Sequence, residues 1–196
     1  MKTPVENQWQ SRIQNLLHHD HNTDDGLEDV TFEVKTREGI SHQIKCHKFV
    51  LALVSPVFKL QFYGSLKAGD NETIKIVDAF YGTFKDFIHF IYNEEPFEKF
   101  KTIENCEKLR NVLELYYLGE KYQIDVLKGY LHFVICNNIS INSTNVFQFL
   151  QDIEDSSPQF QKLYAIVKEL CFDFLDSNIK VFMNTKDEAN VSFQLH

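Results

Sequence analysis

The segment that decides the fold is HKFVLALVSPVFKLQFYGSL, residues 47–66. Its first part, residues 47–54, is almost wholly apolar and predicts a short helix. Ser55 followed by Pro56 predicts the start of a second helix, because serine caps helix N-termini and proline fits the first helical position. We expect this second helix to run to about Tyr63 and to end at Gly64. Two short helices should therefore meet at one Ser-Pro junction.

Strand patterns lie on both sides of this helix pair. Apolar and polar residues alternate over 30–35, where Val30, Phe32 and Val34 form one face, and this is typical of a half-buried strand. Residues 37–39 predict a turn, with Gly39 supplying a positive φ. Residues 40–45 then return as a second strand of a hairpin. A third strand is expected over 73–77, with its two isoleucines on one face.

After Asp78 the apolar spacing becomes helical and stays so. The clearest run is 158–175, which begins with a second Ser-Pro pair. Residues 97–103 are compatible with a short extra strand or a loop, and the polar tail after Phe182 is expected to fray. The other helical runs are 84–91, 109–116, 124–136 and 143–152. This order predicts an α+β fold, with a three-stranded sheet flanked by helices that gather on one side and at one end.

Composition excludes several classes of protein. The 196 residues are 43% hydrophobic, which excludes wholesale disorder, and seven glycines with four prolines are too few for a many-turned β-sandwich or barrel. The net charge of −8 argues against binding nucleic acid through phosphate neutralisation. The longest apolar run, 49–54, is too short to cross a membrane. The N-terminus has no apolar leader, and four scattered cysteines favour a reduced, cytoplasmic protein with the nucleus as an additional location.

Residues with reactive side chains are better explained by structural roles. His47 has no nucleophile or metal ligand at useful spacing, and Asp29 is expected to cap or pair locally where the chain enters the first strand. The histidines at 18, 19 and 21 are too close in sequence to converge on one ion. The four cysteines are expected to be small buried residues. No phosphate-binding glycine loop or nucleophile motif is present, so we predict no catalytic residue, no cofactor and no metal site.

Several ordered motifs resemble the BTB/POZ domain. They are DVTFEV at 29–34, HKFVLA at 47–52, SPVF at 55–58 and FIY at 90–92, with NQWQ upstream, IxIxD at 74–78 and GEKYQIDVL at 119–127. Residues 145–150 resemble the start of the BACK (3-box) extension, and the chain looks most like BTB–BACK proteins that carry a PHR domain. The resemblance covers about 7–176. It implies an N-terminal dimerisation helix and linker (1–24), a BTB/POZ domain (25–136), BACK-like helices (137–182) and a polar tail (183–196). No PHR domain follows, so the chain is expected to be a fragment or a shorter relative.

The resemblance implies protein partners. Many relatives are homodimeric substrate adaptors of cullin-3 ubiquitin ligases, so we expect a second copy of the chain, the cullin-3 N-terminal domain and an unidentified substrate protein. The alternative is an oligomerisation scaffold that does not bind cullin. Helical spacing over 5–19 makes a narrow apolar stripe, which packs either on its own sheet or on a second copy. The expected dimer interface comprises Trp9, Ile13, Leu16, Leu17 and Val50.

A second surface is expected to contact cullin. Cullin-binding relatives carry a hydrophobic residue after the second helix and an acid two positions later. Here Leu66 fits the hydrophobic position, but Ala68 replaces the acid, which favours the scaffold alternative. Glu94 belongs to an acidic run that suits a basic partner or is simply solvated. Phe62 has a second interpretation as a core residue. The expected cullin interface comprises Phe62, Tyr63, Leu66, Asn93, Glu94, Phe147 and Leu150.

Overall fold

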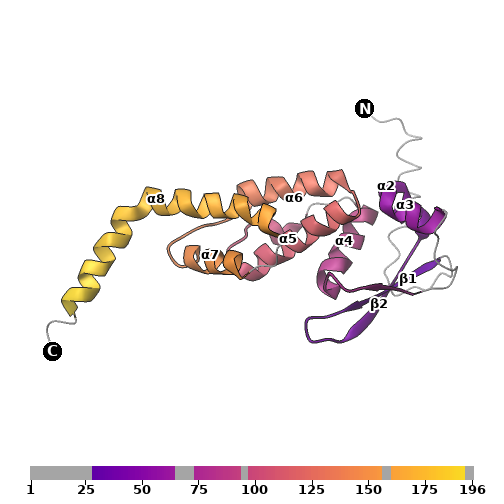
Figure 1. Cartoon of the computed structure of the whole chain (residues 1–196), viewed down its shortest axis with the longest axis horizontal. Helices are drawn as coiled ribbons and strands as arrows, with labels where there is room; N and C mark the ends of the chain where they lie inside the picture. The colour runs from indigo at the N-terminus through magenta and orange to yellow at the C-terminus, as the bar shows by residue number, and fades with distance from the viewer. Residues whose placement is uncertain (1–27, 65–72, 94–96, 156–159, 193–196) are drawn as a thin grey trace. The chain divides into compact units, whose positions relative to one another are not determined.

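The computed structural model describes residues 28–64, 73–93, 97–155 and 160–192 (Figure 1). These residues form two compact units. The first lies within 1–98 and 111–132 and contains the sheet. The second lies within 99–110 and 133–196 and is helical in its described part. Two helices, α5 (Cys106–Lys121) and α6 (Asp125–Asn138), contribute residues to both units.

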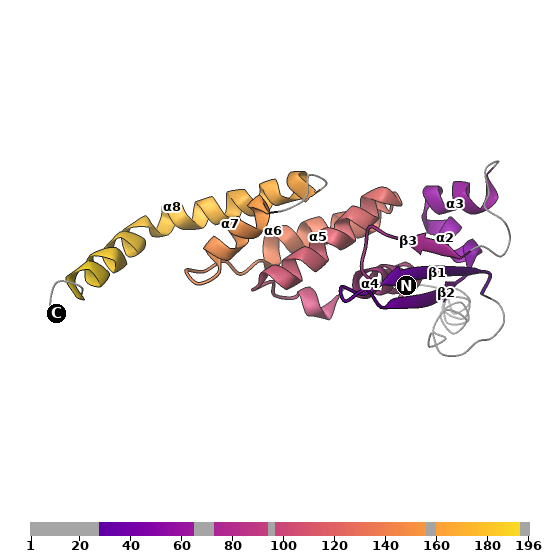
Figure 2. The same cartoon turned by 60° about the horizontal axis from the view of Figure 1, so that its bottom comes forward.

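The sheet of the first unit has three strands in the order β2-β1-β3, with β1 (Val30–Lys35) at its centre (Figure 2). Strand β2 (Ser41–Cys46) is antiparallel to β1, and β3 (Ile74–Ile76) is parallel to it. Gly39 has a φ of 87° in the hairpin turn, as predicted. The observed β2 begins one residue later than expected, and β3 is shorter than the predicted strand. The predicted α+β fold with a three-stranded sheet is confirmed.

The two helices expected around Ser55 are also present. They are α2 (Lys48–Val54) and α3 (Pro56–Tyr63), which lie in the connection between β2 and β3. Helix α4 (Tyr81–Asn93) follows the sheet. The core gathers around Phe32 of β1, whose ring centroid lies 5.9 Å from that of Phe58 and 5.2 Å from that of Phe84. Apolar side chains from the sheet, α3 and α4 therefore meet in one aromatic cluster.

The second unit is built from α7 (Val146–Glu154) and α8 (Gln161–Ser192), together with parts of α5 and α6. The segment predicted as a strand or a loop holds a 3-10 helix (Glu98–Phe100) and one parallel bridge from Ile103 to Ile139. The fraying expected after Phe182 is not observed, because α8 continues through Ser192. Residues 176–192 contain no proline or glycine that would end a helix. Among the described residues, no helix combines the length and apolar character needed to span a membrane.

Candidate functional site: an apolar groove between two helices

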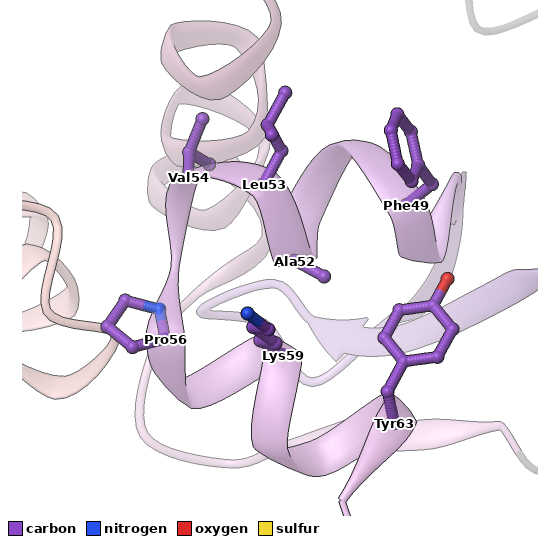
Figure 3. Close-up of a pocket in the computed structure, with 7 residues that line it drawn as sticks. All are labelled: Phe49, Ala52, Leu53, Val54, Pro56, Lys59 and Tyr63. Carbon is purple, nitrogen blue, oxygen red and sulfur yellow. The ribbon is translucent and has the colours of Figure 1, made fainter.

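A largely apolar surface cavity of the first unit lies between α2 and α3. It encloses about 440 Å³ and is lined by Phe49, Ala52, Leu53, Val54, Pro56, Lys59 and Tyr63. Figure 3 shows Phe49 of α2 and Tyr63 of α3 at the same end of the groove, with the Tyr63 hydroxyl directed toward α2. Among the described residues that line it, Lys59 alone carries a charge, so the groove suits an apolar partner surface.

Four large apolar side chains on α2 and α3 are exposed. Phe49 is 68% exposed, Leu53 73%, Leu60 71% and Tyr63 57%. Scattered apolar residues are common on protein surfaces, but four on two adjacent short helices form a cluster of the kind that marks an interaction site. Burying a leucine of this sort in an interface contributes about 2 kcal/mol. The groove can therefore support protein association.

Two contacts fix the start of α2. Asp29 Oδ1 accepts a hydrogen bond of 2.6 Å from the backbone N–H of Lys48, which satisfies one of the unpaired donors at the helix N-terminus. The backbone N–H of His47 donates to Tyr92 Oη at 2.9 Å, and the same oxygen lies 3.0 Å from His47 Nδ1. Burial raises the pKa of Tyr92 well above its usual range. These contacts give His47 and Asp29 the structural roles that the sequence favoured.

The junction between α2 and α3 depends on one buried hydroxyl. Ser55 Oγ accepts a hydrogen bond of 3.1 Å from the backbone N–H of Phe58 and donates one of 2.6 Å to the backbone carbonyl of Tyr122. Tyr122 follows the last residue of α5, so one side chain caps the beginning of α3 and the end of α5. At the other end of α3, a Cβ on Gly64 would lie 2.2 Å from the carbonyl oxygen of Leu60. Glycine is therefore required there.

The structure describes some of the predicted interface residues and not others. Val50 is half-buried on α2, and Tyr63 is exposed beside the groove. Phe62 is only 8% exposed and its ring stacks on Phe58, which agrees with its interpretation as a core residue rather than a contact residue. Asn93 ends α4 and donates from Nδ2 to the His89 carbonyl at 3.0 Å. The predicted sites outside the described residues are Trp9, Ile13, Leu16, Leu17, Leu66, Ala68 and Glu94.

The two remaining predicted contacts lie on α7 in the second unit. Phe147 is 58% exposed, whereas Leu150 is half-buried. Beside Phe147, Asp152 forms an ion pair with Arg110 and accepts a hydrogen bond of 3.1 Å from the Tyr164 hydroxyl. The hydrogen bond to Asp152 raises the pKa of the Arg110 guanidinium. Of these two residues, Phe147 offers the larger contact surface.

Groups with reactive side chains are dispersed. In the part of the chain that the structure describes, no three His, Cys, Asp or Glu side chains cluster closely enough to hold a metal ion. Cys46 and Cys171 are buried as expected, and burial raises the pKa of Cys171 to about 11. Cys106 is partly buried. The prediction of a small buried residue is wrong for Cys136, which is exposed near the end of α6.

Sequence reasoning missed the exposed residues Phe49, Leu53 and Leu60. The sequence does carry a signal at Phe49 and Leu53, because residues 49–54 are apolar on every side of a short helix. A helix that is apolar all round is normally buried on every side, so when one face stays exposed on its own unit that face is a candidate for a partner surface.

Comparisons with known proteins agree on one family. The family model of the BTB/POZ domain matches residues 19–139. The Arabidopsis thaliana BTB/POZ domain-containing protein At4g08455 is 29% identical over 125 residues, which cover 64% of this chain and 48% of that protein. The Arabidopsis BTB/POZ and MATH domain-containing protein 6 is 28% identical over 169 residues, which cover 81% of this chain and 37% of that protein. The mouse TD and POZ domain-containing protein 3 is 28% identical over 115 residues, which cover 59% of this chain and 30% of that protein.

A solved structure supports the same fold. The BTB domain of zebrafish PATZ1 superimposes with a TM-score of 0.51 at 18% identity, covering 69% of this chain and 97% of that domain. The chain spans only 30–48% of the length of the three similar proteins.

Proposed function

Because the chain belongs to the BTB/POZ domain family, whose members are generally protein-interaction modules that commonly dimerise, we propose that it is a homodimeric substrate adaptor for a cullin-3 ubiquitin ligase. In this proposal the chain supplies binding surfaces and the chemistry of ubiquitin transfer occurs elsewhere in the complex. Residues 137–182 act as the start of a BACK extension. The observation that carries the proposal is the exposed apolar groove between α2 and α3.

The proposed dimer joins the groove side of α2 to the N-terminal segment of a second copy. Val50 lies on α2 next to Phe49, and the predicted stripe of Trp9, Ile13, Leu16 and Leu17 would supply a matching apolar face. An interface of this kind repeats under two-fold symmetry, so a single substitution alters it twice. The groove lining is apolar and the N-terminal stripe is predicted to be apolar, which suits burial of one against the other.

Sedimentation analysis tests the dimer. The double variant Leu16→Asp, Val50→Asp is expected to sediment as a monomer, because two unpaired carboxylates per chain would be buried in the interface. Ile40→Asp provides a matched control, since Ile40 is 60% exposed in the hairpin turn, outside the proposed interface. An unchanged dimer in the double variant would exclude this interface.

The proposed cullin contact begins beside Tyr63 and continues into the following segment. Tyr63 is exposed at the end of α3, and Leu66 follows it by three residues in the position where cullin-binding relatives carry a hydrophobic anchor. Aromatic and aliphatic anchors of this kind dominate interface energies. Asn93 and Glu94 belong to this proposed contact in the first unit, and Phe147 and Leu150 are proposed as cullin-contacting residues of the second unit.

A pull-down with the purified cullin-3 N-terminal domain tests the adaptor role. Wild type is expected to bind, Leu66→Asp to lose binding, and Ile40→Asp to bind as the wild type does. The specific observation that favours a second function is Ala68, which replaces the acid of cullin-binding relatives. If the wild type forms a dimer but captures no cullin, the chain is a BTB scaffold, and the sedimentation result stands independently of that outcome.

A further inference from the structure

A second cavity of the first unit lies at the β3 edge of the sheet and shares no lining residue with the α2–α3 groove. It encloses about 500 Å³ and is lined by residues of β1, the hairpin turn, β3 and the loop that precedes α4. We call it the edge cleft. Its lining residues are Glu33, Lys35, Thr36, Arg37, Gly39, Lys75, Ile76, Val77, Ala79 and Phe80.

The backbone of β3 is available for pairing. The strand stands at the end of the order β2-β1-β3, and within the described chain its backbone pairs only with β1. An edge strand presents N–H and C=O groups that can pair with an added strand. Val77, directly after β3, is 90% exposed, which is the highest exposure among the large apolar residues of the described chain. An open edge and an uncovered apolar side chain therefore occur side by side.

Cations predominate in the edge cleft, although the whole chain carries a net charge of −8. Glu33 pairs in register with Lys75, so Lys35 lies two residues further along the same face of the sheet. Within the described residues, neither Lys35 nor Lys75 forms an ion pair. Both lysines are exposed. An acidic partner would therefore meet two exposed cations beside Glu33, whose carboxylate accepts a hydrogen bond from the Ser41 hydroxyl.

Arg37 lines the cleft, but its charge is paired with a carboxylate of the same unit. Its Nη2 lies 3.1 Å from Glu114 Oε1, and its guanidinium carbon lies 4.4 Å from the centroid of the Phe80 ring. Glu114 Oε2 in turn accepts a hydrogen bond of 2.7 Å from the buried Thr83 hydroxyl. The Phe80 ring is thereby held beside the cleft as an apolar surface for a ligand side chain.

We propose that the edge cleft binds an acidic segment of a partner protein, which extends the sheet by pairing with β3. Side chains on one face of a strand recur every second residue, and Lys75 and Val77 are two residues apart. The added strand therefore carries an acid opposite Lys75 and an apolar residue beside Val77, two positions away. Backbone pairing supplies affinity in this mode of recognition, and the alternating side chains supply specificity.

Lysine on an edge strand also prevents aggregation with other edges, and this is the alternative role for Lys75. The two roles make different predictions for an acidic strand. A lysine that only prevents aggregation gives no measurable peptide binding. A lysine that selects acidic partners gives binding of an acidic peptide, and its replacement by glutamate shifts the preference to a basic peptide.

Fluorescence anisotropy with a labelled peptide tests the proposal. The probe has the sequence Glu-Thr-Val-Thr-Glu-Thr-Val-Thr-Glu-Thr, and a second probe replaces each Glu with Lys. Wild type is expected to bind the acidic probe and not the basic one. The double variant Lys35→Glu, Lys75→Glu is expected to bind the acidic probe about tenfold more weakly and to gain affinity for the basic probe. Lys45→Glu, on the other edge strand, is the matched control and should behave as wild type.

Two further measurements sharpen the test. Circular dichroism of the variants checks that they are folded, which is expected because the substituted lysines are exposed. An acidic probe methylated on alternate backbone nitrogens should not bind, because those groups can no longer donate to the edge of β3. The proposal is overturned if the wild type does not bind the acidic probe, if the double variant binds it equally well, or if the methylated probe binds unchanged.

Discussion

Replacing Ser55 with alanine should destabilise the first unit far more than the loss of one hydroxyl suggests. The Ser55 hydroxyl is fully buried and serves two helices, at 3.1 Å from the Phe58 amide nitrogen and 2.6 Å from the Tyr122 carbonyl oxygen. Loss of an N-cap costs about 1 kcal/mol. Leaving the buried Tyr122 carbonyl unpaired costs about 1–2 kcal/mol more. The free energy of unfolding should therefore fall by about 2–3 kcal/mol.

Urea denaturation and thermal melting measure this loss. For a chain of this length, about 2–3 kcal/mol corresponds to a melting temperature lowered by roughly 5–10 °C. Ser41→Ala is the matched control, because the Ser41 hydroxyl makes one exposed hydrogen bond of 3.2 Å to Glu33. That variant should lose less than about 0.5 kcal/mol. Equal losses in the two variants would refute the double-capping role of Ser55.

Three other predictions concern stability and reactivity. Asp78→Asn should lower the free energy of unfolding by about 1 kcal/mol at pH 7, because Lys121 Nζ lies 2.8 and 2.9 Å from the Asp78 carboxylate oxygens. Burial raises the pKa of Asp78, but the contacts with Lys121 and Tyr117 together outweigh it, and the net pKa is lowered. The stability from this carboxylate should therefore be present above pH ~4 and lost below it. A difference in urea stability between wild type and variant that persists at pH 2 would contradict this. Gln123→Gly should raise the melting temperature, because Gln123 has a φ of 55° and glycine at this φ removes about 1 kcal/mol of backbone strain. An unchanged or lower melting temperature would contradict this prediction. A thiol reagent followed by mass spectrometry should label the exposed Cys136 before the buried Cys171, whose pKa burial raises to about 11; the reverse order would disprove this.

Local signals were enough to predict most of the sheet and the helix pair. The alternation of Val30, Phe32 and Val34 predicted β1 and its buried face, and all three side chains are buried. The Ser55-Pro56 pair predicted both the N-cap and the first residue of α3. These features depend on residues a few positions apart, where backbone geometry and side-chain chemistry act together.

Contacts between distant residues could not be predicted in the same way. Nothing near Ser55 indicates that its hydroxyl also reaches Tyr122, 67 residues away. The edge cleft was missed because it depends on β3 standing at the end of the sheet, which is a property of strand order rather than of local sequence. The length of α8 was underestimated because the expected fraying rested on the polar composition after Phe182, whereas helices end where a residue interrupts their backbone hydrogen bonds.

The strand order also sets an expected sequence of folding events. Phe32 pairs with Ile44, 12 residues further along the chain, and with Ile74, 42 residues further along. The longer closure costs about 1 kcal/mol more in chain entropy, so the β1–β2 hairpin should form before β3 docks. In native-state hydrogen exchange, the amides of β3 should therefore open at a lower free energy than those shared by β1 and β2.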